Sequence, residues 1–235
     1  MTWFDQHAYE IRCEWGAEGI DHLAPVTDVF VIVDVMSFSS CVSIATGRGA
    51  VVYPFASLDQ VAHAFATSQN AILATRENGL LLSPSALMTL EADTRLVLPS
   101  PNGSTLTTLT GDSTTLTGCL RNAAAVAERA GSLSGPVTVI PAGERWKGTG
   151  TLRPAIEDWI GAGAIIHHMH GKKSPEAQLA EQAFLFAQNN LAEFLLESSS
   201  ARELLERGGD ADLALILDLN ADSCAPLLVD GAYTV

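Results

Sequence analysis

The stretch DVFVIVDVMSFSSCVSIATGRGA, residues 28–50, contains the pattern that decides the fold. Its apolar run predicts a buried strand at 28–34 that ends in Asp34, and a helix follows at 38–47. A buried strand that leads into a helix is the repeating unit of a parallel sheet. Ligands bind outside the carboxyl ends of the strands in such sheets, so Asp34 is delivered to the edge where a site is expected.

The same unit recurs along the chain. We expect further strands at 50–55, 71–75, 94–98, 113–117 and 136–141. We expect further helices at 57–68, 121–130, 152–168, 174–196 and 199–207, with a short one after the strand at 94–98, while 212–219 fits either element. This alternation predicts an α/β fold, a three-layer sandwich around a largely parallel or mixed sheet in one domain over 1–235, and leaves open two similar lobes.

Charge and composition limit the partners. The chain has 235 residues, a formal net charge of −14 and 47% hydrophobic residues. Phosphate backbones require clustered Lys and Arg, so we expect neither a nucleic-acid nor an anionic-membrane partner. The four cysteines are scattered without metal or redox spacing, which predicts free, mostly buried thiols.

Localisation is predicted from what the sequence does not contain. The stretch MTWFDQHAYEIRCEWG at 1–16 has neither a basic segment nor an apolar segment of the kind found in signal peptides. No apolar run reaches the roughly 18 residues of a membrane span. We therefore expect a cytoplasmic protein, and the sequence leaves open a homodimer.

Asp34 itself has two interpretations. It could cap the following helix through its carboxylate, or it could be a metal ligand or nucleophile. The D-x-D pattern of aspartyl-nucleophile phosphatases is absent, because Met36 stands at its second position. The residues alone leave both roles open.

The stretch SPNGST at 100–105 also has two interpretations. Asn-Gly is a strong turn signal, which favours a plain turn. The same residues could form a backbone and hydroxyl cluster that holds phosphate. The stretch lacks the Gly-Lys-Ser/Thr ending of a Walker loop, so it is not one.

Two motifs flank the helix predicted at 152–168. Glu157 and Asp158 near its start point about 100° apart, so only one is expected to face a site squarely. Gly161 and Gly163 predict close helix packing, because glycine costs about 1 kcal/mol against alanine inside a helix. At its other end, HHMHG at 167–171 looks like a metal site, yet histidines are common at helix carboxyl ends, and we favour that interpretation.

Taken in order, these motifs resemble the 2-phosphosulfolactate phosphatase family. VIVDVMSFSS is similar to that family's strand ending in Asp-Val-Leu-Arg, SPNGS to its Thr-Asn-Gly-Thr loop, and GCLRNA to its Gly-x-x-x-Asn-Ala turn. VIPAGERW followed by LRPAIEDWIGAGAII resembles its Ala-Gly turn and Glu-Asp helix, and the C-terminal stretch also fits. Each motif is weak, and their shared order carries the resemblance.

The chain also departs from the family pattern. Ser37 stands where the family has arginine, and Arg76 and Glu77 appear in swapped order relative to its Gly-Glu-Arg. A following Gly-Asn-Ser-Pro segment is reduced to Ser83 and Pro84. Loss of an arginine removes a planar, bidentate anion clamp, so these departures bear on the substrate.

The resemblance implies a Mg²⁺-dependent phosphatase acting on a small acidic, 2-phosphosulfolactate-like phosphomonoester. The implied catalytic and metal-binding residues are Asp34, Glu157 and Asp158, because a divalent ion beside a phosphate requires hard oxygen ligands. The implied substrate-binding residues are Ser39, Ser40, Asn102, Gly103, Ser104, Asn122, Gly143, Arg145 and Arg153. Two rivals stay open: a non-catalytic relative that binds a small anion, which Ser37 favours, and an unrelated α/β enzyme whose turns match by chance.

Overall fold

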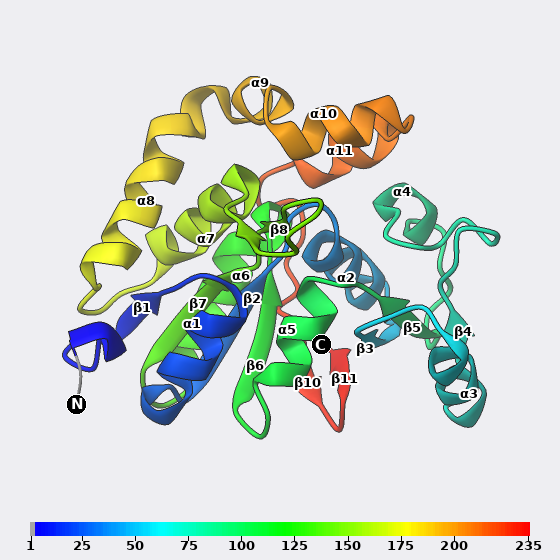
Figure 1. The fold of residues 1–235 in the computed structure, drawn as a ribbon, viewed down its shortest axis with the longest axis horizontal. Helices are drawn as coiled ribbons and strands as arrows, with labels where there is room; N and C mark the ends of the chain where they lie inside the picture. The colour runs from blue at the N-terminus through cyan, green and yellow to red at the C-terminus, as the bar shows by residue number, and fades with distance from the viewer. Residues whose placement is uncertain (1–2) are drawn as a thin grey trace.

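A mixed sheet lies between layers of helices in the computed structural model, which describes residues 3–235 (Figure 1). Its nine strands follow the order β1-β7-β2-β6-β10-β11-β3-β5-β4. The strands are β1 (Ile11–Cys13), β2 (Val29–Val33), β3 (Val51–Phe55), β4 (Ile72–Leu73), β5 (Arg95–Pro99), β6 (Thr114–Gly118), β7 (Val137–Pro141), β10 (Leu227–Val229) and β11 (Ala232–Thr234). The predicted α/β fold with a mixed sheet is confirmed.

Two parallel groups of strands make up this sheet. One contains β1, β7, β2 and β6, and the other contains β3, β5 and β4. The antiparallel hairpin β10–β11 joins them, since Leu227 pairs with Leu116 of β6 and Tyr233 pairs with Val52 of β3. The last residues of the chain therefore complete the sheet at its centre.

Strand β2 explains why the deciding stretch is apolar on both faces. Val29, Val31 and Val33 pack into a cluster with α6 (Ala123–Ser132), α7 (Ile156–His168) and α8 (Pro175–Ala187). Phe30 and Ile32 face the opposite layer, with α1 (Gly16–Leu23) and α5 (Gly103–Leu109). Successive side chains of a strand point to opposite faces, so a strand covered on both sides loses the polar alternation.

The second group of strands is covered in the same way. Val52, Leu96 and Leu98 pack with α2 (Phe38–Gly47) and α4 (Pro84–Leu87). Tyr53 and Val97 face α3 (Gln60–Ser68) on the other side.

Helix α7 begins later than predicted and packs as closely as predicted. Residues 152–153 form a strand, and Pro154 disfavours a helical residue before it, so the helix starts at Ile156 and not at 152. A Cβ at Gly163 would lie 2.0 Å from the carbonyl oxygen of Ala180 on α8, and one at Gly161 would lie 2.6 Å from Val35. These contacts confirm the close packing that the glycines predict.

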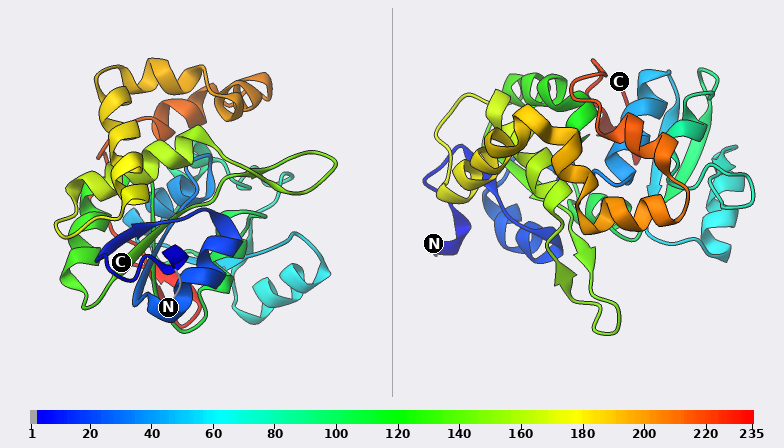
Figure 2. Two further views of the ribbon diagram at one scale, coloured as in Figure 1. Left: turned by 60° about the vertical axis from the view of Figure 1, so that its left-hand side comes forward. Right: turned by 90° about the horizontal axis from the view of Figure 1, so that it is seen from above.

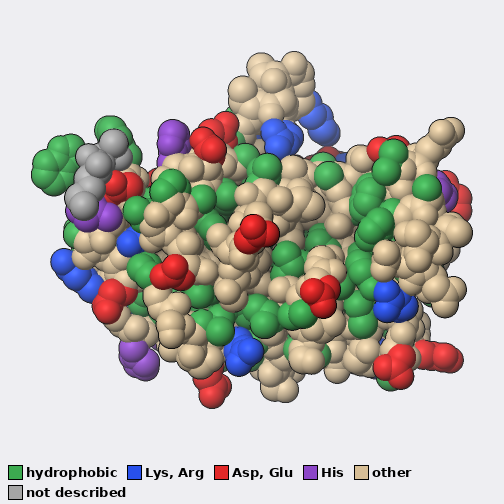
Figure 3. Space-filling view, turned by 90° about the horizontal axis from the view of Figure 1, so that it is seen from below, with side chains coloured by type: hydrophobic (Ala, Val, Ile, Leu, Met, Phe, Trp, Pro, Cys, Tyr) green, Lys and Arg blue, Asp and Glu red, His purple; other side chains and the backbone are tan. Residues whose placement is uncertain are grey.

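A projecting hairpin was not predicted. Strands β8 (Glu144–Arg145) and β9 (Leu152–Arg153) pair antiparallel, and the hairpin extends away from the body of the molecule (Figure 2). Figure 3 shows the same protrusion at one edge of a face over which acidic side chains are spread singly. The hairpin begins where β7 ends, so it borders the carboxyl edge of the first group of strands.

Elements β1, α1 and α4 in the first half of the chain were not predicted, and the second half differs in the bounds of its helices. The helix predicted at 174–196 ends at Ala187, because a 3-10 turn at Gln188–Asn190 redirects the chain before α9 (Leu191–Leu196). The predicted helix at 199–207 is α10 (Ser199–Glu206), and the ambiguous segment is helical as α11 (Asp210–Ile216). In Figure 1 these helices run across the top of the sheet.

The cysteine prediction is confirmed. Cys13, Cys41 and Cys119 are buried and Cys224 is partly exposed, and all four are free thiols. Among residues 3–235, no helix is both long and apolar enough to cross a membrane.

Candidate active site

A cavity of about 580 Å³ opens at the carboxyl ends of β2 and β5. We call the residues at its base the floor: Asp34, Ser37, Ser100, Asn102 and Glu144. We call the charged and polar residues around its mouth the rim: Arg76, Ser83, Glu203, Arg207 and Asp212. Apolar side chains complete the wall: Met36, Leu58, Leu81, Leu82 and Leu204. The cavity therefore lies where ligands are expected to bind, at the carboxyl ends of parallel strands.

Asp34 lies at the floor, only 5% exposed. The backbone N–H of Gly103 donates to its Oδ2 at 2.8 Å, and Ser100 Oγ lies 3.4 Å from the same oxygen. Its Oδ1 receives only a long contact, 3.4 Å from the backbone nitrogen of Phe38. This long contact is the interaction that corresponds to the helix-cap interpretation of Asp34, and it leaves Oδ1 with capacity for another partner.

Gly103 must be glycine for this arrangement. A Cβ there would lie 2.2 Å from the Phe38 ring and 2.9 Å from Asp34 Oδ2. The loop at 100–105 is thus both a turn and a close approach of backbone to the carboxylate. Asn102 lines the cavity beside it, and its backbone N–H donates to Ser100 Oγ at 3.3 Å.

Three of the predicted substrate-binding hydroxyls are fully buried and bonded within the protein. Ser39 Oγ accepts from the backbone N–H of Asp34 at 2.9 Å and lies 2.8 Å from Thr117 Oγ1. Ser40 Oγ donates to the carbonyl of Val35, and Ser104 Oγ donates to the carbonyl of Leu98. They hold the strand ends in place and do not line the cavity.

Asn122 is also directed into the protein. Its Oδ1 accepts from the backbone N–H of Cys119 at 2.9 Å, and its Nδ2 donates to the carbonyl of Cys224 at 3.2 Å. The side chain is fully buried. The Asn-Ala turn of the sequence therefore fixes the C-terminal segment against the end of β6.

Asp158 joins two strand ends to the start of α7. Its Oδ1 accepts from the backbone N–H of Val35 at 2.7 Å, and its Oδ2 accepts from that of Gly143 at 2.9 Å. Gly143 has φ +67°, and a Cβ there would lie 2.7 Å from Leu152, so glycine is required at this turn. Asp158 is 3% exposed, and both of its oxygens already have partners.

Glu157 and Arg153 lie at the side of the site next to α10. Glu157 is 3% exposed and hydrogen-bonds to the side chain of Ser200, a residue that lines the cavity. Arg153 Nη2 is 3.4 Å from Ser200 Oγ, and its guanidinium lies 5.9 Å from the ring centre of Trp146. Ser200 thus separates both predicted side chains from the open space of the cavity.

Arg145 lies outside the cavity. Its Nη1 donates to the carbonyl of Gly150 within the hairpin, and the side chain borders a smaller hollow of about 230 Å³. Asn102 and Glu144 line both hollows, so these two residues separate them.

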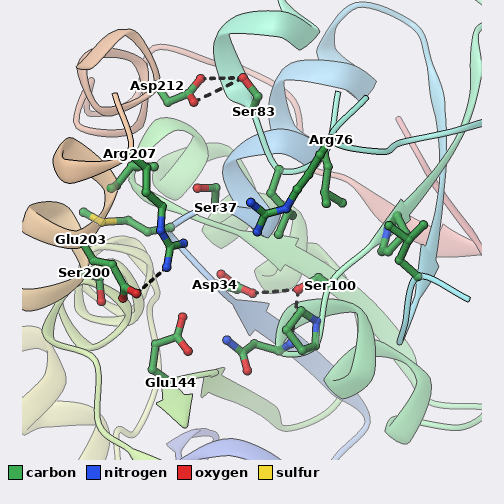
Figure 4. A pocket seen from close by; sticks show the side chains of 18 of the residues that line it. Asp34, Ser37, Arg76, Ser83, Ser100, Glu144, Ser200, Glu203, Arg207 and Asp212 are labelled. Atoms are coloured by element: carbon green, nitrogen blue, oxygen red, sulfur yellow. Dashed lines mark hydrogen bonds and ion pairs between the residues drawn. The ribbon is translucent and has the colours of Figure 1, made fainter. Parts of the chain in front are cut away.

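The arginines that do line the cavity are Arg76 and Arg207, and neither was predicted as a site residue. Figure 4 shows both side chains extending over the floor that holds Asp34 and Ser100. Arg76 belongs to the segment whose swapped order marks a departure from the family pattern, and that is the one sequence signal for it. Arg207 ends an amphipathic helix in which nothing in the sequence distinguishes it.

The carboxylates near the floor influence one another. Burial raises the pKa of Asp34 to about 6, and the charges of Glu144 and Glu157 add to that rise. Burial also raises the pKa of Glu157. Burial raises the pKa of Asp158 well above its usual value, with contributions from Glu157 and Asp34. Such a concentration of buried negative charge is the environment that a bound cation relieves.

The donor set at the floor suits a hard cation. Within residues 3–235, no group of three or more His, Cys, Asp and Glu side chains converges as the ligands of a metal ion. Mg²⁺, however, is commonly held by one or two carboxylates, with waters and substrate phosphate completing its shell. Asp34 and Glu144 line the same cavity and provide that number of carboxylates.

Fold and site together define an α/β protein with an acidic, hydroxyl-bearing pocket at the carboxyl ends of its parallel strands. A family model described as 2-phosphosulpholactate phosphatase matches residues 18–231. The chain belongs to this family, and it is an enzyme of the phosphoric monoester hydrolase class. A chance match of turns in an unrelated enzyme is excluded by the extent of this match. No curated protein matches the chain.

Proposed function

We propose that the protein is a Mg²⁺-dependent phosphatase that hydrolyses a small acidic phosphomonoester in the cavity above Asp34. The observation that carries the proposal is the state of the Asp34 carboxylate. It is buried at the floor, one oxygen is fixed by the N–H of Gly103, and the other has only a 3.4 Å contact to Phe38. A carboxylate held in this way has one oxygen oriented for a ligand.

Asp34 is the first metal ligand in this proposal, and Glu144 is the second, because both line the cavity. When bound, Mg²⁺ would neutralise phosphate charge and lower the pKa of a coordinated water. Ser37, Ser100 and Asn102 donate hydrogen bonds to substrate oxygens from the floor. The fixed positions of these groups reduce the entropic cost of orienting the ester.

The other predicted catalytic residues take supporting roles. Asp158 bonds to the backbone N–H groups of Val35 and Gly143, so we assign it the positioning of the two strand ends. Glu157 reaches the cavity through Ser200 and contributes to the pKa of Asp34, so it tunes the charge of the floor. Ser39, Ser40, Ser104 and Asn122 are assigned to the same structural support.

Phosphate release from a panel of phosphomonoesters tests the proposal. The protein is first dialysed against a chelator, and Mg²⁺ or Ca²⁺ is then added to separate samples. Release that depends on Mg²⁺ and is weaker with the larger Ca²⁺ supports it, since Mg²⁺ requires near-octahedral geometry at short distances. Phosphate binding without release from any ester would favour the non-catalytic, anion-binding relative. Release at full rate in the chelated protein would refute the Mg²⁺ dependence.

A further inference from the structure

The rim of the cavity carries an arginine without a protein partner. Among the residues that the structure describes, the Arg76 guanidinium forms no hydrogen bond or ion pair, although Asp34 and Glu144 line the same cavity. Arg207 pairs with Glu203 alone and keeps further N–H donors. In Figure 4 both side chains extend into the space over Asp34.

Two arginines at one cavity are notable in a chain with this charge. The protein has 13 Lys and Arg against 27 Asp and Glu, so carboxylate partners are abundant. Arg76 and Arg207 come from segments far apart in the sequence and meet at one cavity. Asp212 holds those segments together, because it accepts from Ser83 Oγ at 3.1 Å and from the backbone N–H of Ser85 at 2.8 Å.

Apolar side chains line the same cavity as the arginines and the floor. Met36, Leu81, Leu82 and Leu204 are only partly buried, and Leu58 is 43% exposed. A cavity of about 580 Å³ is within the range typical of drug-sized ligands, which have many more atoms than a phosphorylated three-carbon acid. The cavity thus combines a polar floor, apolar side chains and a rim on which Arg76 is unpaired, while the rim carboxylates Glu203 and Asp212 already bond to Arg207 and to Ser83 and Ser85.

We propose that the substrate is a phosphomonoester with a second acidic group, a carboxylate or sulfonate, separated from the phosphate by an apolar segment longer than that of a three-carbon acid. The phosphate binds at the floor, the apolar segment lies along the leucines, and Arg76 and Arg207 bind the second acid. This inference rests on the proposed function and adds the length and the distal charge of the substrate. Arg76 and Arg207 are then the residues that determine specificity.

Two matched pairs of esters test the inference by turnover. The long pair is 6-phosphonooxyhexanoate and hexyl phosphate, and the short pair is 2-phosphoglycolate and ethyl phosphate. Each pair differs only by a carboxylate in place of a terminal methyl group. We expect the carboxylate to raise kcat/KM about tenfold to hundredfold in the long pair and little in the short pair, as hydrogen bonds to a charged group allow.

Variants assign the effect to the rim. Arg76→Gln removes the charge and keeps a side chain of similar length, so we expect it to reduce the carboxylate advantage of the long pair about tenfold. Arg129→Gln is the matched control, because Arg129 is also exposed, makes no side-chain bond to a described residue and lies on α6 away from the cavity. This control is expected to keep the advantage intact. Equal turnover within the long pair, or an advantage that Arg76→Gln leaves unchanged, overturns the inference.

Binding separates this inference from the proposed function. 7-Phosphonoheptanoate and heptylphosphonate cannot be hydrolysed as esters. Calorimetry with this pair therefore measures, without turnover, how much the binding of a distal carboxylate by Arg76 and Arg207 (the distal clamp) adds to affinity. Tighter binding of the carboxylate compound, lost in Arg76→Gln, supports the clamp even when no ester is hydrolysed, in which case the phosphatase proposal alone fails. Equal binding of the two phosphonates overturns the clamp even when esters are hydrolysed.

Discussion

The floor and the rim of the cavity are built in different ways. Floor residues such as Asp34 and Ser100 directly follow buried strands, are 5% and 1% exposed, and are held by backbone contacts. Arg76 and Arg207 of the rim are exposed side chains on connecting segments. In the proposed function, the floor supplies the reacting groups, which the strand ends position, and the rim supplies charge from exposed side chains on connecting segments. The proposal thus assigns chemistry and specificity to different parts of the sequence.

The largest effect is expected from neutralising the floor. Asp34→Asn keeps the shape of the side chain and the acceptor for Gly103 but loses the charge. We expect Mg²⁺-dependent phosphate release to fall by roughly 10²–10³-fold or more, as for removal of a central electrostatic group. Steady-state kinetics measure this, and near-UV circular dichroism checks that the fold is intact. Turnover near that of the wild type would show that Asp34 only accepts structural hydrogen bonds and takes no part in catalysis.

The next prediction concerns stability and the contact that attaches α11, which carries the rim residue Asp212, to the end of β6. Arg121 is 4% exposed, forms a bidentate pair with Asp222 at 2.8 Å, and donates to the carbonyl of Leu215 at the end of α11. Arg121→Met leaves Asp222 without its partner, so we expect the free energy of unfolding to fall by about 3–5 kcal/mol. Urea denaturation measures it, and the double variant with Asp222→Asn should recover part of the loss. A single-variant loss below about 1 kcal/mol, the level of an exposed pair, would contradict this role.

Sequence patterns predicted the floor better than the rim for a physical reason. The strand before Asp34 and the turn at 100–105 are local features, so periodicity and turn chemistry reveal them. The partner to which a serine hydroxyl points, however, depends on the folded structure around it and cannot be seen in the local sequence. Ser39 and Ser104 satisfy neighbouring backbone groups, and the sequence could not distinguish that use from substrate binding.

The unpredicted parts depend on contacts between distant segments. The hairpin β10–β11 is short, and it is held by pairing with β6 and β3, which no local pattern shows. Arg207 reaches the cavity because Asp212 on the following helix bonds to Ser83 and Ser85, more than a hundred residues earlier. Arg145 and Arg153 were predicted because they follow the Ala-Gly turn and open the Glu-Asp helix of the resembled pattern, but the hairpin directs them elsewhere.

An intermediate effect is expected from adding a cation to the floor. Ser37 is 7% exposed and lines the cavity where the resembled family pattern has arginine. We expect weak native activity on 2-phosphosulfolactate, and Ser37→Arg should raise the preference for it over an uncharged ester about tenfold to hundredfold. The ratio of kcat/KM values measures this preference. Ser37→Gln, similar in length to arginine but uncharged, is the control for crowding.

Two results would contradict the substrate argument. Robust native turnover of 2-phosphosulfolactate that Ser37→Arg leaves unchanged would show that the departure at Ser37 is neutral. An equal gain with Ser37→Gln would show that size and not charge is responsible. Thermal unfolding of both variants checks that the buried position tolerates the longer side chain.

The smallest effect is expected at the far end of α7. At 1.5 Å per residue, His167 in the last turn of this helix lies roughly 13 Å along the axis from Asp158 near its start. There His167 Nδ1 lies 3.1 Å from Glu181 on α8, which also pairs with Lys173. Changing His167, His168 and His170 together to Gln should leave Mg²⁺-dependent turnover and metal content unchanged. Stability should fall by less than about 1 kcal/mol, the scale of exposed pairs and helix-dipole contacts. Metal analysis by mass spectrometry and urea denaturation measure both, and a large loss of bound metal would move the metal site from the floor of the cavity to this end of the helix.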